Sequence, residues 1–295
     1  MKSSKSSEKE IKTITPELIA NALGEAVVKV PLDVVSALEI AIASETSPLA
    51  RMHLRSILDN IEMANNEYLP VCEDTGIQTI FVDAGRDFPH LGELLKAIPE
   101  AVELATVSGP LRPNTVNPFT GKNYGNNLGP NAPAINLTMV EGGGATIHLL
   151  PKGGGSEQLS ALWMLTPADG LKGARREILS HIQKAGGRPC PPVIIGIGLG
   201  GSADTCLKLA KRSLLRPLGS ANPDPDAAAM ERDLLEAINR LGVGPMGMGG
   251  TTTTLAVHVE SAPRHPANFP VGLVMQCWCH RHITIHFDRK GAVRE

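Results

Sequence analysis

The sequence predicts a mixed α/β protein with a helical N-terminal portion, and three observations carry this prediction. Over residues 15–70, a threonine or serine directly followed by a proline occurs twice. Each pair precedes a segment whose apolar residues recur at helical spacing. From residue 77 onward, short apolar runs that suit buried strands interleave with helical segments. These runs lack the strict alternation of a parallel sheet, so a mixed sheet is expected after the helices.

The first expected elements are helices. Thr15-Pro16 and Ser47-Pro48 each place a capping hydroxyl before a first-turn proline. In the segment that follows Ser47, apolar side chains at roughly helical spacing predict a stripe that faces the core. They are Leu49, Met52, Ile57, Leu58 and Ile61. Residues 77–82 indicate a buried strand, and residues 91–107 indicate a helix that Pro99 should kink or break.

The second half of the chain should hold most of the sheet. Residues 108–131 have little periodicity, and a loop of that length in a compact protein is usually functional or a linker. Further strands are expected at 134–140, 145–150, 192–198, 257–259, 271–276 and 283–287. Further helices are expected after Ser156 and at 170–185, 202–215 and 225–241.

Composition excludes several functional classes. A net charge of −2 gives no electrostatic case for binding nucleic acid. No apolar run reaches the ~20 residues of a membrane span, and the polar start lacks the apolar core of a signal peptide. Five cysteines, an odd number, indicate reduced thiols in the cytoplasm. We expect a disordered tail over residues 1–13 and one domain over residues 14–295.

Three cysteines stand in turn-forming or strand-end contexts far apart in the sequence: Cys72, Cys190 and Cys277. A soft metal centre that takes one thiolate from each of several distant loops needs this arrangement. Three thiolates around a four-iron cluster would leave one iron open, as a Lewis acid toward a substrate oxygen. The simpler interpretation of any single cysteine is a small buried apolar residue, and Cys206, inside an expected helix, fits it best.

Cys277-Trp-Cys279-His280-Arg-His282 resembles a zinc motif at first sight. Zinc sites usually combine one close pair of ligands with a distant second pair, and no second pair occurs in this sequence. Zinc is therefore disfavoured, and one cysteine of the pair as a cluster ligand is the better interpretation.

Two glycine-rich segments allow different interpretations. Gly196-Ile-Gly198-Leu-Gly-Gly201 fits a dinucleotide fingerprint, but the second strand with its acidic end is missing, which disfavours a nicotinamide oxidoreductase. The glycines are better explained by close helix–strand packing or by a loop near the site. Lys152-Gly-Gly-Gly-Ser156 is either an anion-binding turn at a helix start or a plain capped turn.

Six segments together resemble one known family, the class I iron–sulfur fumarases, from about residue 14 onward. They are Cys72-Glu-Asp-Thr-Gly76, the Asn123–Asn127 loop, Lys152-Gly-Gly-Gly-Ser156, Cys190-Pro-Pro192, Leu215-Arg-Pro217 and Asn239-Arg-Leu-Gly-Val-Gly-Pro245. The chain is most similar to the α subunits of two-subunit relatives, fumarate hydratase and L(+)-tartrate dehydratase. The resemblance implies a mixed-sheet iron–sulfur hydro-lyase domain of the α type.

The resemblance also implies the site. A [4Fe–4S] cluster would be held by Cys72, Cys190 and Cys277, with the fourth iron binding the substrate. By the family's pattern the residues in contact with a dicarboxylate substrate would be Glu73, Asp74, Arg112, Gly155 and His265. Among these, Asp74, Arg112 and His265 would be the catalytic residues. An iron–sulfur regulatory protein is disfavoured, because a regulator needs no arginine, histidine and anion loop together.

The resemblance favours reversible hydration of fumarate to L-malate, with dehydration of L(+)-tartrate to oxaloacetate as the alternative. Glu73 stands where most members carry Gln and adds a possible negative charge beside the substrate, and Cys279 is an additional thiol. In the family a second domain supplies the catalytic base, and this sequence ends soon after its third cysteine. We therefore expect a separately encoded β subunit and an assembly such as α₂β₂ or an α homodimer.

Overall fold

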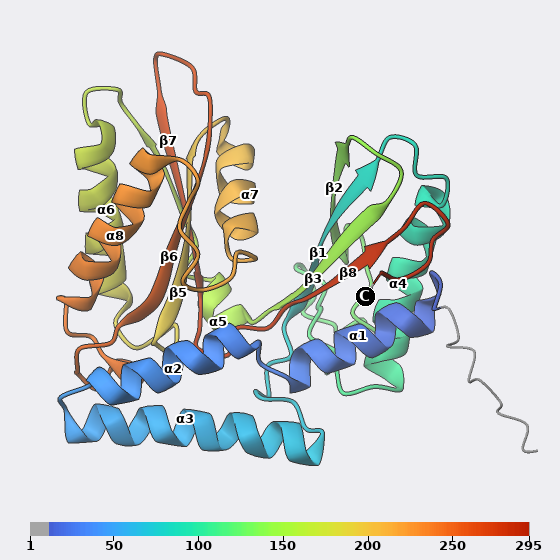
Figure 1. The fold of residues 1–295 in the computed structure, drawn as a ribbon, viewed down its shortest axis with the longest axis horizontal. Coiled ribbons are helices and arrows are strands. Elements are labelled where there is room, and N and C mark those ends of the chain that lie inside the picture. The colour runs from blue at the N-terminus through green and yellow to red at the C-terminus, as the bar shows by residue number, and fades with distance from the viewer. Residues whose placement is uncertain (1–11, 295) are drawn as a thin grey trace, which may run out of the picture. The chain divides into compact units, whose positions relative to one another are not determined.

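The computed structural model describes residues 12–294, which form two compact units (Figure 1). The first unit contains the described residues up to Ala26, residues 78–150 and residues from 283 onward. The second unit contains residues 27–77 and 151–282. Of the predicted tail, residues 1–11 lie outside the described residues. Residues 12 and 13 are ordered by a bridge from Thr13 to Ala292 and a hydrogen bond from Val293 N to Lys12 O of 2.8 Å.

The first unit is built on a four-stranded mixed sheet in the order β2-β1-β3-β8. Its strands are β1 (Ile77–Gly85), β2 (Ala134–Val140), β3 (Ala145–Lys152) and β8 (Ile283–Phe287). Strands β1 and β2 are parallel, whereas β3 and β8 are antiparallel. The unit's helices are α1 (Pro16–Val28) and α4 (Leu91–Val107). Thr15 Oγ1 accepts a hydrogen bond from Leu18 N, as the predicted cap requires.

Pro99 does not break its helix, so that part of the prediction is wrong. Helix α4 runs through Pro99 without interruption. The proline removes one backbone donor, but on both sides of it the helix buries an apolar face that includes Leu94, Ile98 and Val102. Burial of that face outweighs the missing hydrogen bond.

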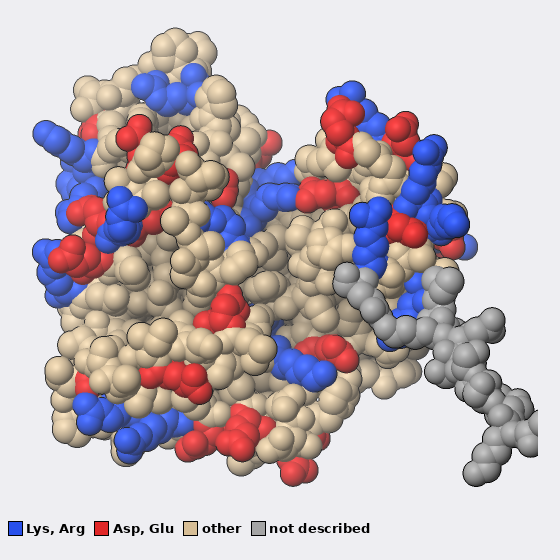
Figure 2. Space-filling view, in the orientation of Figure 1, with Lys and Arg blue, Asp and Glu red and all other residues tan. Residues whose placement is uncertain are grey.

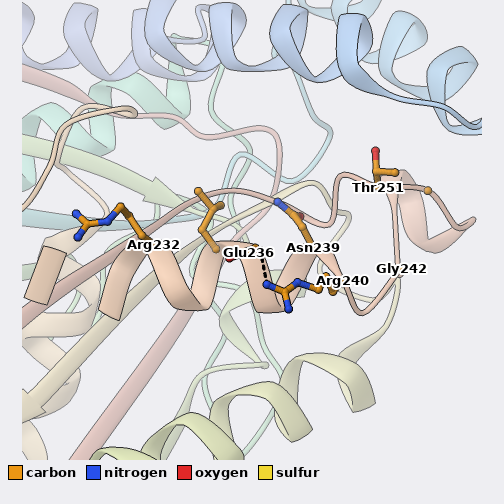
Figure 3. Close-up of a pocket in the computed structure, with 8 residues that line it drawn as sticks. Arg232, Glu236, Asn239, Arg240, Gly242 and Thr251 are labelled. Atoms are coloured by element: carbon orange, nitrogen blue, oxygen red, sulfur yellow. Dashed lines mark ion pairs between the residues drawn. The ribbon is translucent and has the colours of Figure 1, made fainter. Parts of the chain in front are cut away.

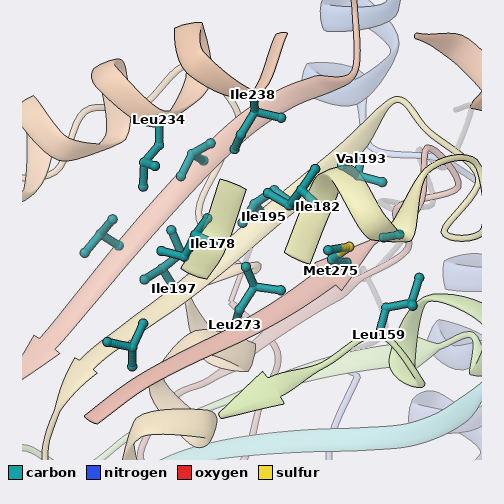
Figure 4. Close-up of a cluster of buried hydrophobic side chains, with 14 of the residues drawn as sticks. Leu159, Ile178, Ile182, Val193, Ile195, Ile197, Leu234, Ile238, Leu273 and Met275 are labelled. Carbon is teal, nitrogen blue, oxygen red and sulfur yellow. The ribbon is translucent and has the colours of Figure 1, made fainter. Parts of the chain in front are cut away.

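The second unit has three layers, with helices on both faces of a sheet in the order β4-β7-β5-β6 (Figure 1). The strands are β4 (Ala161–Leu165), β5 (Val193–Gly200), β6 (Thr254–Ala262) and β7 (Phe269–Gln276). Helices α6 (Gly170–Ala185) and α8 (Pro225–Asn239) cover one face and α7 (Ala203–Ser213) the other. Figure 4 shows the core between α6, α8 and the sheet, including Ile178, Leu234, Ile195 and Leu273. The mixed α/β prediction is confirmed.

The glycines that suggested a dinucleotide site let α7 approach the sheet. A Cβ atom at Gly196 would lie 2.0 Å from Ala210 O, and one at Gly198 would lie 2.0 Å from Cys206 O. Either contact is impossible, so these positions accept no side chain. Close helix–strand packing therefore explains both glycines, as the alternative interpretation predicted.

Two further helices, α2 (Leu32–Ser44) and α3 (Pro48–Glu67), belong to the second unit. The buried residues of α3 follow a different stripe from the predicted one: Ala50, Leu54, Ile57, Ile61 and Ala64. Leu49 and Met52 are 42% and 54% exposed, so their inclusion was wrong, because small alanines take two of the inward positions. Figure 2 shows charges of both signs along α3. No helix among the described residues is long and apolar enough to cross a membrane.

Two predictions beyond Lys152 differ from the structure. The expected helix after the glycine-rich turn is a single turn, α5 (Gly154–Glu157), and strand β4 follows it where none was predicted. The remaining irregular element is a short 3-10 turn, η1 (Pro245–Gly247).

Candidate functional site

Within the second unit, three loops bring the predicted cysteine ligands to one end of the sheet. Cys190 precedes β5 and Cys277 follows β7, and the antiparallel register pairs Ile194 with Gln276. A hydrogen bond of 3.3 Å from Trp278 N to Cys190 O ties these two loops together. Cys72 lies in the turn after α3, where it packs with Cys277 and Trp278 at the edge of the same apolar cluster. The three cysteines therefore lie near one another.

These thiols are partly accessible, and Cys277 lies close enough to Cys190 to affect its pKa. Cys190 is exposed, whereas Cys72 and Cys277 are half-buried. Burial raises the pKa of Cys190, and the nearby Cys277 and Glu73 raise it further. Burial also raises the pKa of Cys72 to about 11, against the lowering effect of Arg281. The Cys72 thiol donates to Glu73 Oε2 at 3.4 Å. A raised pKa favours the thiol form, so the use of Cys72 and Cys190 as ligands requires a metal that displaces the proton.

Asp74 is held in place by two backbone donors. Its Oδ1 accepts from Gly76 N at 2.9 Å, and its Oδ2 accepts from Gly154 N at 2.7 Å. The second bond joins the turn after Cys72 to the first turn of α5. Gly153 lies beside this contact, because a Cβ there would lie 3.2 Å from Asp74 Oδ2. Gly155, in the same turn, is exposed and has open space around its Cα.

Lys152 is a buried cation at the base of the glycine-rich turn. It is 2% exposed, its Nζ donates to Ser156 Oγ at 2.6 Å, and it lies 3.5 Å from Glu157 Oε2. Glu157 also pairs with Lys211 on α7. Burial lowers the pKa of Lys152 to about 8, while the nearby Glu157 and Cys277 act in the opposite direction. This network fixes the turn that presents Gly154 to Asp74.

The segment between β7 and β8 has a buried centre. Cys279, His280 and Arg281 are each at most 1% exposed. His280 Nε2 lies 2.9 Å from Leu214 O, and Gln276 Nε2 donates to Cys279 O at 3.1 Å. Burial raises the pKa of Cys279 above its ordinary value, which favours an uncharged thiol. His280 is therefore committed to the backbone, and Cys279 behaves as a core residue.

The donor set fits an iron–sulfur cluster. Three loops bring the three cysteines near one another, and two buried nitrogen atoms of the nearby Arg281 side chain, Nε and Nη1, have no hydrogen-bond partner. No group of His, Cys, Asp or Glu within residues 12–294 could hold a single metal ion. In a cluster each thiolate binds a different iron, so the ligands lie further apart than those around one ion.

Arg112 lies in the first unit, on the long loop after α4. It is exposed, and its carbonyl oxygen accepts a hydrogen bond of 2.8 Å from Asn127 Nδ2. Asn127 is 2% exposed and also contacts Thr106 and Asn114, through bonds of 2.9 and 2.6 Å. One buried amide thus orders the loop that carries Arg112.

His265 is not brought to its own chain's cysteines. It is exposed in the connection between β6 and β7, at the opposite end of β7 from Cys277. The eight residues of β7 span about 26 Å at ~3.3 Å per residue. Arg264 closes this connection by donating to the carbonyl oxygens of His265, Pro266 and Asn268.

A cavity of about 700 Å³ lies elsewhere in the second unit (Figure 3). Arg232 and Asn239 of α8 line it together with Thr251 and with Arg240, the residue after the helix, which pairs with Glu236. It contains no cysteine, and no predicted site residue lines it. This cavity is thus separate from the candidate site.

Three residues of the site were not predicted in these roles: Lys152, Gly153 and Arg281. Each stands within a segment that the sequence singles out, next to a glycine run or the last cysteine pair. Only the fold shows that Lys152 and Arg281 are buried, because charged side chains are usually exposed.

Comparison with known proteins gives one family and a consistent set of relatives. The chain matches the family described as fumarate hydratase over residues 16–286. It is 42% identical over 269 residues to a Methanocaldococcus jannaschii protein provisionally named L(+)-tartrate dehydratase subunit alpha, covering 90% of this chain and 94% of the relative. It is 37% identical over 275 residues to the L(+)-tartrate dehydratase subunit alpha of Escherichia coli, covering 92% and 91%. The corresponding Shigella sonnei protein is 36% identical.

Proposed function

Because the chain belongs to the fumarate hydratase family, we propose that it is the cluster-bearing subunit of a hydro-lyase acting on a four-carbon dicarboxylate. Membership makes it a hydro-lyase, an enzyme that adds or removes water at a carbon–carbon double bond. The convergence of Cys72, Cys190 and Cys277 at one end of the sheet is the observation that carries the proposal.

Cys72, Cys190 and Cys277 would hold a [4Fe–4S] cluster through their thiolates. Such a cluster, with one iron free of a protein ligand, supplies a Lewis acid for the hydroxyl group of the substrate. Cys206, in α7, and Cys279, two residues after Cys277, are both buried, and we assign neither to the cluster.

Asp74 is the group of this chain best suited to hold a proton near the reacting atoms. Two N–H donors fix both of its oxygens, so the carboxylate keeps one orientation beside Cys72. We assign Asp74 to proton transfer, and the Lys152 network to the position of the turn that holds it.

Arg112 and Gly155 would bind substrate carboxylates. A guanidinium can form two parallel hydrogen bonds to a carboxylate, and the order of its loop restricts the side chain to one region. The N–H of Gly155, in the first turn of α5, would be a backbone donor to a substrate carboxylate.

If His265 contacts the substrate, it must do so at the cysteines of a different copy of the chain. Since its own cysteines lie at the far end of β7, the histidine in a given pocket would come from another copy of the chain. Pairing of α subunits, as in α₂β₂, provides such a copy. Mixed assemblies of His265→Ala and Cys190→Ser chains test this: recovered activity supports sharing between chains, and no recovery contradicts it.

Fumarate is the first candidate substrate, with L(+)-tartrate as the second because the relatives carry that name. The relatives are also alpha subunits, which supports a separate β subunit that completes the site. We propose that the β subunit supplies the catalytic base and further cationic contacts.

Anaerobic reconstitution of the five single Cys→Ser variants tests the ligand assignment. Absorbance near ~400 nm, typical of iron–sulfur clusters, should be lost at positions 72, 190 and 277. Cys206→Ser and Cys279→Ser serve as controls and should keep it. Full iron content in Cys190→Ser would overturn the assignment.

Assays with the β subunit decide the substrate. Fumarate, L-malate, L(+)-tartrate and mesaconate are compared by kcat/KM, with the reconstituted chain alone as control. We expect turnover only with both subunits, and fumarate or tartrate as the best substrate. Activity on none of the dicarboxylates would contradict the proposed function.

A further inference from the structure

The side chain of Arg281 is the largest that is fully buried among the described residues, at 1% exposed. It stands between Cys279 and His282, in the segment that joins β7 to β8. A guanidinium stays charged in proteins, so this position places a permanent positive charge inside the second unit.

Most of the hydrogen-bonding capacity of Arg281 is unused within the chain. Its Nε and Nη1 atoms are buried and have no hydrogen-bond partner. Two other deeply placed cations differ: Lys152 donates to Ser156, and Arg216 pairs with Glu231 at 2.6 Å. A buried charge without partners is costly, so an arginine kept in this state implies a ligand that the protein chain itself does not provide.

The surroundings of Arg281 indicate an electron-rich ligand at the cysteines. Burial alone would lower the pKa of Arg281, but the nearby Cys279, Cys277 and Cys72 raise it. Asp74 has a smaller effect in the same direction. Arg281 in turn lowers the pKa of Cys72. Its Nη2 atom lies beside Gly153, 3.5 Å from the position of a Cβ there, on the same side as Asp74. The guanidinium thus lies near Asp74 and near two of the proposed cluster ligands.

We propose that Arg281 donates hydrogen bonds from Nε and Nη1 to sulfur atoms of the cluster held by the three cysteines and offsets its negative charge. This inference rests on the proposed function, since it needs the cluster. Sulfides and thiolates are hydrogen-bond acceptors that satisfy both free donors. Hydrogen bonds to sulfur and nearby charge are among the factors that set the potential and stability of such clusters. Arg281 is therefore a positioning and tuning residue rather than a catalytic one.

Three proteins are compared after anaerobic reconstitution: wild type, Arg281→Gln and Arg281→Lys. Arg232→Gln, at an exposed arginine of α8, is the matched control. In Arg281→Gln, cluster release to a chelator should accelerate about tenfold or more, the loss expected for charge-assisted hydrogen bonds, and the midpoint potential should become more negative. Arg281→Lys keeps the charge without the fork and should show an intermediate effect. The control should match wild type.

One measurement needs no variant. Wild-type protein labelled with ¹⁵N in its arginine guanidinium groups should show hyperfine coupling to ¹⁵N when the reduced cluster is studied by pulsed electron paramagnetic resonance. This result holds even if the Arg281 variants fail to fold.

The outcomes separate the two proposals. Wild-type chain that binds no cluster refutes the proposed cofactor. A cluster with unchanged potential and release rate in Arg281→Gln, or without ¹⁵N coupling in wild type, refutes only the role of Arg281. A raised KM with unchanged cluster properties would assign Arg281 to the substrate instead, which also overturns the inference.

Discussion

Replacing Lys152 by methionine should make the cluster-free chain more stable at neutral pH. Burial is the main cause that lowers the pKa of Lys152 from 10.5 to about 8, despite the attraction of Glu157 and Cys277. Each pKa unit corresponds to about 1.4 kcal/mol, so the buried ammonium costs about 3 kcal/mol at pH 7. Loss of the contact with Ser156 offsets about 1 kcal/mol of that gain. The free energy of unfolding should therefore rise by about 2 kcal/mol.

The pH dependence fixes the sign of this prediction. Between pH 8 and pH 10.5 the unfolded lysine still binds a proton that the folded one has released, so wild-type stability rises with pH in this window. The advantage of Lys152→Met should accordingly be full at pH 7 and shrink toward pH 10.5.

Urea unfolding of the metal-free proteins, followed by circular dichroism at pH 7 and pH 10, measures this difference. Lys172→Met, at an exposed lysine of α6, is the control and should change stability little at either pH. A Lys152→Met protein less stable than wild type at pH 7, with no dependence of the difference on pH, would refute the reasoning.

Three substitutions test the site further. Gly153→Ala has a compatible backbone (φ −64°, ψ 141°), but its Cβ would press on Asp74 Oδ2. Because a 1 Å misplacement of a catalytic group costs about 100-fold in rate, this smaller shift should lower kcat about three- to tenfold. The stability of Gly153→Ala should stay within ~1 kcal/mol of wild type. The control Gly92→Ala should show equally little change in stability and should keep full kcat. Glu73→Gln removes a negative charge at an exposed position, so KM for a dicarboxylate should fall by about two- to fivefold; an unchanged KM would place Glu73 away from the substrate. Arg112→Lys keeps the charge but loses the guanidinium fork, so kcat/KM should fall by the equivalent of ~1.5–3 kcal/mol, and wild-type kinetics would limit Arg112 to ordering its loop.

The sequence predicted the element types well where periodicity and caps agree. Helix α6 and strands β2 and β8 have the predicted bounds, because turn residues delimit a clear apolar pattern. Strand β4 was missed, since its five residues follow a glycine turn that suggests a longer helix. In α3 the alanines carry the inward stripe, which a search for large apolar residues passes over.

The candidate site was predictable only in part. Motif context singled out the cysteines and Asp74, and the fold brings these residues together. The buried charges of Lys152 and Arg281 depend on long-range packing that no local pattern reveals. The resemblance suggested His265, but the strand register alone shows that β7 separates it from its own cysteines.

The cluster is the centre of this account, and ⁵⁷Fe Mössbauer spectroscopy of the anaerobically reconstituted chain tests it most directly. With three thiolate ligands, four irons per chain should appear, and one of the four should change its spectrum when a dicarboxylate is added together with the β subunit. Four irons whose Mössbauer spectra are all unchanged by the dicarboxylate would contradict the proposed open iron. The absence of any four-iron species would contradict the proposed cluster.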